Sequence, residues 1–251
     1  MSDDSVYSKG LIYDTSLPVP TDNDEWRGAR QTRYNERFNQ PIGNWRYARS
    51  REQTYFVAHN PTIDQATTLI GHAAPLLADA DATLTKPLVA MVMPASASIC
   101  AELDYIEIDV VTAGATGVSS EWTAQIDNGR SITTAGITFT RVNPNMMSTV
   151  TPALLVTGGP IVVAAETSNC RVLGNGFIRE AIEFAGDRTT FVFGGEPSNG
   201  ANVVAGAASR STVTLPPVTL GAGDGFFLAL YSATGQNAAG IYRVRMAWSE
   251  R

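Results

Sequence analysis

The chain has 251 residues, a formal net charge of −6 at pH 7 and two cysteines, and 44% of its residues are hydrophobic while only 17% are charged. This length suits one large all-β domain or two small ones, and the apolar content is enough for a sizeable core. Cys100 and Cys170 are too few for a disulfide framework, and we interpret them as small buried apolar residues. The acidic start, without an apolar stretch, predicts no secretory signal, and the sequence has no run of 18 apolar residues, so we expect no membrane span.

The N-terminal part of the chain differs in charge from the rest. Residues 26–51 contain seven arginines and one acid, a net charge of +6, whereas residues 53–251 contain ten basic and sixteen acidic residues, a net charge of −6. Blocks of opposite sign can pair within a subunit or between subunits. Aromatic residues are interleaved with these arginines, and Trp, Tyr and Arg are enriched at the energetic centres of protein interfaces.

We therefore predict that residues 1–52 form a docking arm outside the main domain, which spans residues 53–251. One stretch of the arm has a helical pattern. Asp24 is a suitable N-cap, and the residues of the expected helical face recur every four positions at Trp26, Arg30, Tyr34 and Phe38. We expect the rest of the arm to be extended and ordered by contact with a partner. The predicted partner-binding residues are Trp26, Arg27, Arg30, Arg33, Tyr34, Arg37, Phe38, Trp45, Arg46, Arg49 and Arg51.

Nucleic acid is the alternative partner for this arm. Arginines could bind phosphates, and the aromatic side chains could stack on bases. However, the whole chain is acidic, with a pI near 4.9, whereas nucleic-acid-binding domains are usually basic. We favour docking onto a protein.

From Gln53 onward the pattern is that of short strands. Apolar and polar residues alternate, and turn signals separate the runs by about 8–12 residues, which is typical of a sandwich or barrel. The fold class we predict is all-β, an antiparallel, jelly-roll-like β-sandwich preceded by an extended N-terminal arm with one short helix. The expected strands are 53–59, 67–72, 86–93, 103–112, 119–126, 131–142, 153–165, 169–179, 189–193, 212–219, 225–232 and 240–248.

Three features of these strands lead to specific expectations. The dipeptide Asn128-Gly129 is the strongest hairpin signal, since a type I′ turn needs two positive φ angles. In 240–248, apolar residues alternate with Arg243, Arg245 and Ala247, which predicts a half-buried strand that ties the end of the chain into a sheet. The run 225–231 is apolar on both faces and is interpreted as a central core strand, or as a strand covered by another subunit.

Catalytic and metal-binding motifs are not found in the sequence. It has no nucleophile elbow, phosphate loop, HExxH or CxxC motif, and its two histidines, His59 and His72, are interpreted as surface or core residues. Acidic clusters at Asp22–Glu25 and Asp79–Asp81 lack a full calcium-loop pattern. We expect no enzyme activity, no catalytic residues, no metal and no cofactor.

Three stretches of the chain resemble the small β-sandwich virion proteins of tailed bacteriophages. They are the entry strand SREQTYFVAHNP (50–61), the run KPLVAMVMPASAS (86–98) followed by the strand 103–112, and the ending that begins PPVTLGAGDGFFLAL and closes YRVRMAWSE (216–250). The resemblance concerns the layout of residues 50–251. It implies a trimeric structural component of the particle that decorates the head or forms a spike or tail piece.

We therefore expect a head decoration or cement protein, made in the bacterial cytoplasm and located in the virion. Its partners would be further copies of itself and the major capsid protein or other virion proteins. The alternative is a receptor- or carbohydrate-binding module of a tail or spike, for which Trp122 is the one tryptophan in the middle of the β region. A glycan hydrolase would need two carboxylates held across a cleft, and the sequence places no such pair.

Overall fold

The protein is described by a computed structural model. Contacts divide the chain into two compact units, Met1–Ala48 and Arg49–Arg251. The division lies four residues before the expected boundary at residues 52 and 53. The structure describes residues 30–31, 37–38, 45–60, 70–71, 84–114, 120–179, 184–195, 208–232 and 240–251.

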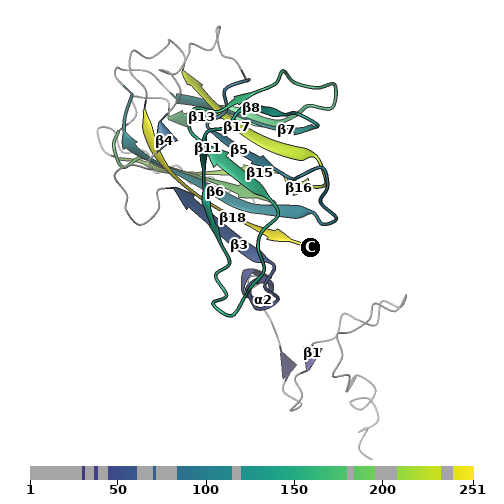
Figure 1. Ribbon diagram of the computed structural model, residues 1–251. Helices are drawn as coiled ribbons and strands as arrows, with labels where there is room; N and C mark the ends of the chain where they lie inside the picture. Colours follow the sequence, from purple (N-terminus) through teal and green to yellow (C-terminus); the bar gives the residue numbers. More distant parts are fainter. Residues whose placement is uncertain are drawn as a thin grey trace, which may run out of the picture. The chain divides into compact units, whose positions relative to one another are not determined.

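Two large β-sheets make up the body of the second unit (Figure 1). The eight-stranded sheet contains β3 (Tyr55–Asn60), β4 (Ile70–Gly71), β6 (Ala101–Thr112), β10 (Thr140–Val142), β14 (Arg188–Phe193), β15 (Arg210–Leu215), β16 (Thr219–Leu220) and β18 (Ile241–Glu250). The six-stranded sheet contains β5 (Val89–Val92), β7 (Ser120–Asn128), β9 (Ile137–Thr138), β11 (Leu155–Gly158), β13 (Arg171–Arg179) and β17 (Asp224–Ser232).

The edge strands of the two sheets lie next to each other on both sides of the sandwich. Their orders are β10-β3-β18-β6-β14-β15, with β16 beside β6 and β4 beside β18, and β13-β7-β17-β5-β11-β9. At one edge the chain passes from β9 through the buried Phe139 into β10, and at the other edge β13 contacts β15. The predicted β-sandwich is confirmed, and the described residues after Arg51 contain no helix. The pairing is antiparallel apart from β14 and β15, which are parallel.

Aromatic side chains fill the space between the sheets. The ring of Trp122 from β7 meets Phe191 from β14 edge to face, with centroids 5.1 Å apart. Phe193 and Phe226 make a similar contact at 5.3 Å. Such edge-to-face pairs are favourable beyond the area that they bury. Trp122 is therefore a core residue, 5% exposed, and it does not supply the exposed aromatic surface that a carbohydrate-binding module would need.

The last strand, β18, lies between β3 and β6 near the centre of the larger sheet. Its apolar residues Tyr242, Val244, Met246 and Trp248 are fully buried, whereas Arg243 is exposed. The predicted alternation holds from Tyr242 to Met246, but Ala247, expected on the opposite face, is also fully buried, so the last residues of the strand are buried on both faces.

Strand β17 is central in the smaller sheet, between β7 and β5, as expected for 225–231. Its outer face is covered by the same chain, since Phe227 packs in a cluster with Ile161 and Val163. The guanidinium of Arg130 lies over the Phe227 ring, 4.9 Å from its centroid. A contact between subunits is therefore not what buries the apolar outer face at Phe227.

The hairpin predicted at Asn128-Gly129 is wrong. Gly129 has a positive φ of 78°, but among the described residues Gln53 is the one non-glycine with positive φ, so the turn is not type I′. After the turn the chain leaves the sheet, and β8 (Ile132–Thr134) pairs with β12 (Val162–Val163) in a separate two-stranded sheet. The strand β7 pairs instead with β13 and β17.

Some expected strands are divided in the structure. The range 131–142 contains β8, β9 and β10, the range 153–165 contains β11 and β12, and 212–219 overlaps β15 and β16. Within the expected strand 67–72, the described part is β4. The divisions within 131–142 and 153–165 let the chain move between sheets, whereas β15 and β16 pair with different strands of the same sheet. A one-dimensional pattern of apolar residues does not report either change.

In the first unit, Arg30–Gln31 (β1) pairs antiparallel with Arg37–Phe38 (β2). The predicted helical face is therefore wrong at Arg30 and Phe38. Side-chain pairs four residues apart stabilise a helix by only about 0.2–0.5 kcal/mol each, too little to form a short isolated helix. The described helix is α2 (Trp45–Arg51). No helix within the described ranges is long and apolar enough to cross a membrane.

Candidate docking site

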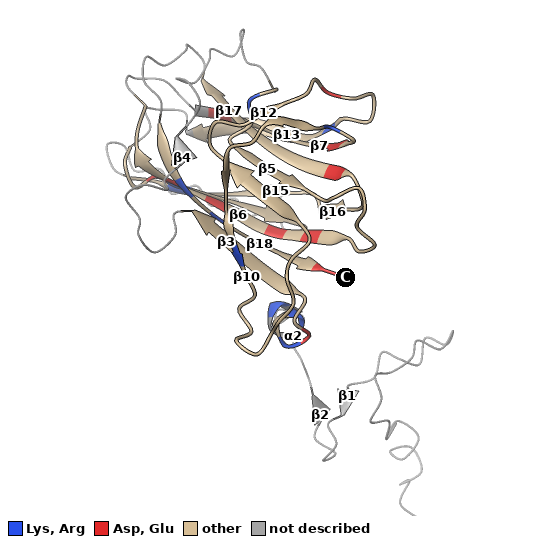
Figure 2. Cartoon of the chain, viewed as in Figure 1, with Lys and Arg blue, Asp and Glu red and all other residues tan. Residues whose placement is uncertain are grey.

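The structure places the predicted docking residues in three groups. Arg30, Arg37 and Phe38 belong to β1 and β2, and Trp45, Arg46, Arg49 and Arg51 belong to α2. Trp26, Arg27, Arg33 and Tyr34 lie outside the described residues. In Figure 2, α2 stands out as a basic segment, and its last turn carries Arg49 and Arg51.

The start of the sandwich unit is joined to β6 by an ion pair. Arg49 Nη2 lies 3.6 Å from Glu102 Oε2, and both side chains are about three-quarters covered, with 23% and 25% of their area exposed. Glu102 also pairs with Arg251 near the end of the chain. Arg49, predicted to meet a carboxylate of a partner, thus has a carboxylate of its own chain beside it.

The turn between α2 and β3 is fixed by backbone geometry and side-chain hydrogen bonds. Gln53 adopts a left-handed φ of 62°, its N–H donates to Ser50 O at 3.1 Å, and Thr54 N–H donates to Arg49 O at 3.0 Å. The amide of Asn143 donates to Gln53 O, and that of Asn145 donates to Ser50 O. A left-handed non-glycine residue persists where its surroundings over-determine it, so the start of the sandwich unit is held in a defined turn.

Many carboxylates of the acidic sandwich are buried acceptors rather than free surface charges. Asp104 accepts a hydrogen bond from Tyr55, Asp127 from the Thr167 backbone and Asp187 from the Ser209 backbone, and all three are 2–3% exposed. Part of the negative charge of the sandwich therefore belongs to carboxylates that accept hydrogen bonds within the same chain.

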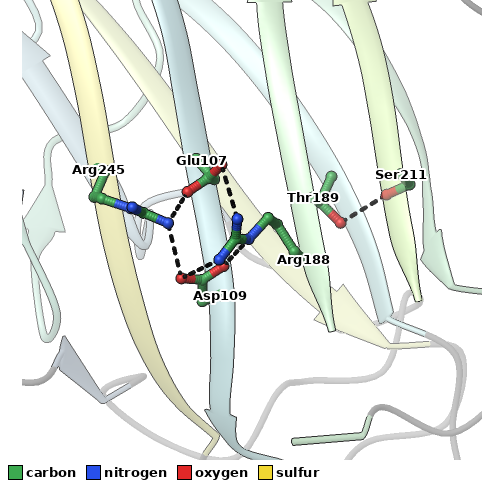
Figure 3. A network of polar contacts seen from close by, with 6 residues as sticks. All are labelled: Glu107, Asp109, Arg188, Thr189, Ser211 and Arg245. Carbon is green, nitrogen blue, oxygen red and sulfur yellow. Dashed lines mark hydrogen bonds and ion pairs between the residues drawn. The ribbon is translucent and has the colours of Figure 1, made fainter. Parts of the chain in front are cut away.

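One cluster of charges lies across three strands of the larger sheet (Figure 3). Glu107 and Asp109 project from β6 toward Arg188 of β14 and Arg245 of β18. The Arg188 Nε–Asp109 Oδ1 distance is 2.6 Å, and this hydrogen bond is the main reason why the pKa of Arg188 is raised. The negative charges of the two carboxylates balance the positive charges of the two guanidiniums. Both acids lie on β6, and not on opposite sides of a cleft as a glycan hydrolase would need. The cluster is best explained as a cross-strand staple.

Replacing Asp109 tests this interpretation. Asp109 is 8% exposed, but its arginine partners have a third or more of their side-chain area exposed. Solvent screening therefore limits the effect, and we expect Asp109→Ala to lower the free energy of unfolding by about 1–2 kcal/mol. Urea denaturation at low and high salt measures this value, which should shrink at high salt. Thr190→Ala, on the neighbouring strand, is the control, and an equal effect of both changes would contradict the staple.

Other reactive groups form no recognisable centre within the described part of the chain. No group of three or more His, Cys, Asp or Glu residues there could hold a metal ion. Cys100 and Cys170 are free and half-buried, and burial, followed by the nearby Glu166, raises the pKa of the Cys170 thiol. His59 is half-buried on β3. His72 and both acidic clusters lie outside the described residues.

A feature that the sequence analysis missed is the loop 143–150 beside the end of α2. It presents Met146 and Met147, 95% and 85% exposed. The adjacent methionines could have drawn attention, because they stand between turn-forming residues in Asn-Pro-Asn-Met-Met-Ser. Comparisons with protein-family models, with curated proteins and with solved structures gave no match to this chain.

Proposed function

We propose that the protein is a structural component of a bacteriophage particle, a head decoration protein that docks through its N-terminal arm and stabilises the shell. The observation that carries this proposal is the division of the chain. A β-sandwich unit, Arg49–Arg251, follows a separate N-terminal unit whose arginines and aromatic residues are those of a docking segment. The fixed turn at Gln53 gives the sandwich unit a defined start.

The resemblance of residues 50–251 to small virion β-sandwich proteins supports the particle as the setting. The arm is long enough for this role: although β1 and β2 fold back on each other, an arm of about 50 largely extended residues reaches on the order of 100 Å or more. Such a reach would allow the arm of one copy to cross onto neighbouring subunits or onto the major capsid protein. The sandwich would then stand on the outside of the shell, as one member of a trimer.

Immunoelectron microscopy tests this proposal. Particles purified from cells that produce this chain would be labelled with an antibody raised against the sandwich, and their proteins quantified by mass spectrometry. We expect label distributed over the head and a copy number comparable to that of the shell subunits. Label confined to the tail tip would favour the receptor-binding alternative, and absence of the chain from purified particles would refute the proposal.

A further inference from the structure

The loop 143–150 is held in one conformation although its two methionines project into solvent. Asn143 Oδ1 accepts from Asn145 N–H at 2.9 Å, Asn145 Oδ1 accepts from Met147 N–H at 3.0 Å, and Ser148 Oγ accepts from Val150 N–H at 3.1 Å. The Asn143 and Asn145 amides also bind the turn after α2. The apolar side chains are thus displayed on a braced support, which lowers the entropic cost of burying them in a contact.

The segment that forms this loop carries no charge of its own, although charged residues border it: Glu250 accepts hydrogen bonds from Ala153 and Leu154, and Arg141 donates to Leu154 O. Residues 142–165 contain no Asp, Glu, Lys, Arg or His, in a chain in which 17% of residues are charged. Depletion of charge together with enrichment of methionine distinguishes the centre of a protein interface from ordinary surface. The uncharged segment and its exposed methionines therefore make this loop a candidate contact surface.

Apart from Ile99, the exposed large apolar side chains of the described residues gather at two opposite edges of the sandwich. The first set, here called the Met edge, lies beside β9, β10 and β11, and the second, the β13 edge, lies on β13. The Met edge consists of Val142, Met146, Met147, Val150 and Leu155, and the β13 edge consists of Val172 and Phe177. In the strand order the two edges are five strand spacings apart, or about 24 Å.

We propose that the Met edge of one copy packs against the β13 edge of a second copy of this chain. Within one copy the two edges are too far apart to cover each other, whereas a neighbouring copy can cover both. The β13 edge suits this contact, because residues 172–178 are also uncharged. A contact between two different surfaces of identical subunits is head to tail, and it forms a ring where the rotation closes.

The size of the Met edge is consistent with this assignment. The run Val142–Leu155 has 14 residues, of which Pro152 and Leu154 are buried within the sandwich, and a standard interface uses roughly 20–30 residues on each side. The run would thus form the centre of the contact, with neighbouring strand residues as its rim. This inference rests on the proposed homo-oligomer, and it assigns the contact to the sandwich rather than to the arm.

Charge substitutions at each edge provide the test. Sedimentation velocity would be measured for the full chain, for a Met-edge variant (Met146→Glu with Met147→Glu) and for a β13-edge variant (Val172→Glu with Phe177→Glu). We expect the parent to form a closed ring, a trimer. We expect each variant to associate roughly 30-fold more weakly, the change expected on losing an interface hot spot. Ile99→Glu, at an exposed apolar residue outside both edges (38% exposed), should behave as the parent.

Mixing the two variants makes the test specific. Each variant retains one intact edge, so an equimolar mixture should form dimers through the remaining Met-edge and β13-edge pair and should not grow further. Circular dichroism would verify that both variants are folded. A monomeric parent, variants that associate as the parent does, or a mixture that stays monomeric would each overturn the proposal. None of these results would bear on docking of the arm, because all variants carry it intact.

Discussion

Removal of residues 1–44 is expected to leave a folded β-sandwich that no longer joins the particle. The sandwich unit begins at Arg49 and contains the aromatic core, so the truncated chain should unfold cooperatively in urea. Incorporation should fall to background, because buried aromatic and arginine anchors are commonly worth 2 kcal/mol or more each on truncation. Quantifying the chain in particles assembled with the truncated protein measures the effect.

Two further variants separate the effects of the arm on the stability of the sandwich from the effect of the arm's charge on incorporation. Truncation at residue 52 should in addition destabilise the sandwich by about 1–2 kcal/mol, since it removes Arg49 from Glu102 and the Ser50 carbonyl from Asn145. Replacing Arg27, Arg30, Arg33 and Arg37 by Gln keeps the length of the arm and tests its charge. Normal incorporation of the 1–44 truncation would contradict the arm proposal, and failure of that truncation to fold would show that the arm belongs to the core.

The nucleic-acid alternative predicts a different behaviour of the arm. An isolated peptide of residues 1–44 would then bind DNA, with a logarithmic salt dependence of about −0.9 per phosphate contacted on duplex DNA. A protein-docking arm need not bind DNA at all. Fluorescence anisotropy at several salt concentrations distinguishes the two cases.

Glu250→Ala is expected to cause a large loss of stability for a single substitution of a charged residue. Glu250 is 4% exposed, and its carboxylate accepts hydrogen bonds from Ala153 N–H, Leu154 N–H and Trp248 Nε1–H, each at 2.9 Å. Alanine would leave three donors without their acceptor, and each buried unsatisfied group costs about 1–3 kcal/mol. We expect a loss of about 3–5 kcal/mol, against a total of about 5–15 kcal/mol for a typical domain.

Urea denaturation of matched variants measures this effect. Glu250→Gln should be intermediate, because the amide keeps one acceptor oxygen and turns an N–H group toward the remaining donors. Glu102→Ala is the control, since Glu102 is a more exposed acid whose described ion pairs are with arginines, and it should cost about 1 kcal/mol or less. A Glu250→Ala variant that is as stable as Glu102→Ala would show that the three hydrogen bonds contribute little.

Local patterns in the sequence were sufficient for the fold class and for individual strands. In β18 the alternation of apolar and charged residues identified Tyr242, Val244, Met246 and Trp248 as the buried face, and all four are buried. A period of two residues is a property of a single strand, so neighbouring residues alone reveal it. The same reasoning failed at Asn128-Gly129, because a turn sequence does not specify which strands pair on either side of it.

The candidate site could be predicted only in part. Composition singled out the arginine-rich segment, and the structure places Trp45, Arg46, Arg49 and Arg51 on α2. It could not reveal that Glu102, about fifty residues later, lies beside Arg49, or that much of the acidic charge is buried in hydrogen bonds. These relations depend on contacts between distant parts of the chain, which a local pattern does not contain.

The sequence by itself determined that this chain is a β-sandwich with a chemically distinct, basic N-terminal segment. The tertiary structure alone decided the order of the strands, the covering of β17 by the chain's own Ile161 and Val163, and the separation of exposed apolar residues into two edges. The physical reason is that burial depends on which strands become neighbours. Met147 and Phe227 are both apolar in sequence, yet one is 85% exposed and the other 1%, because packing between distant segments covers Phe227 and leaves Met147 in solvent.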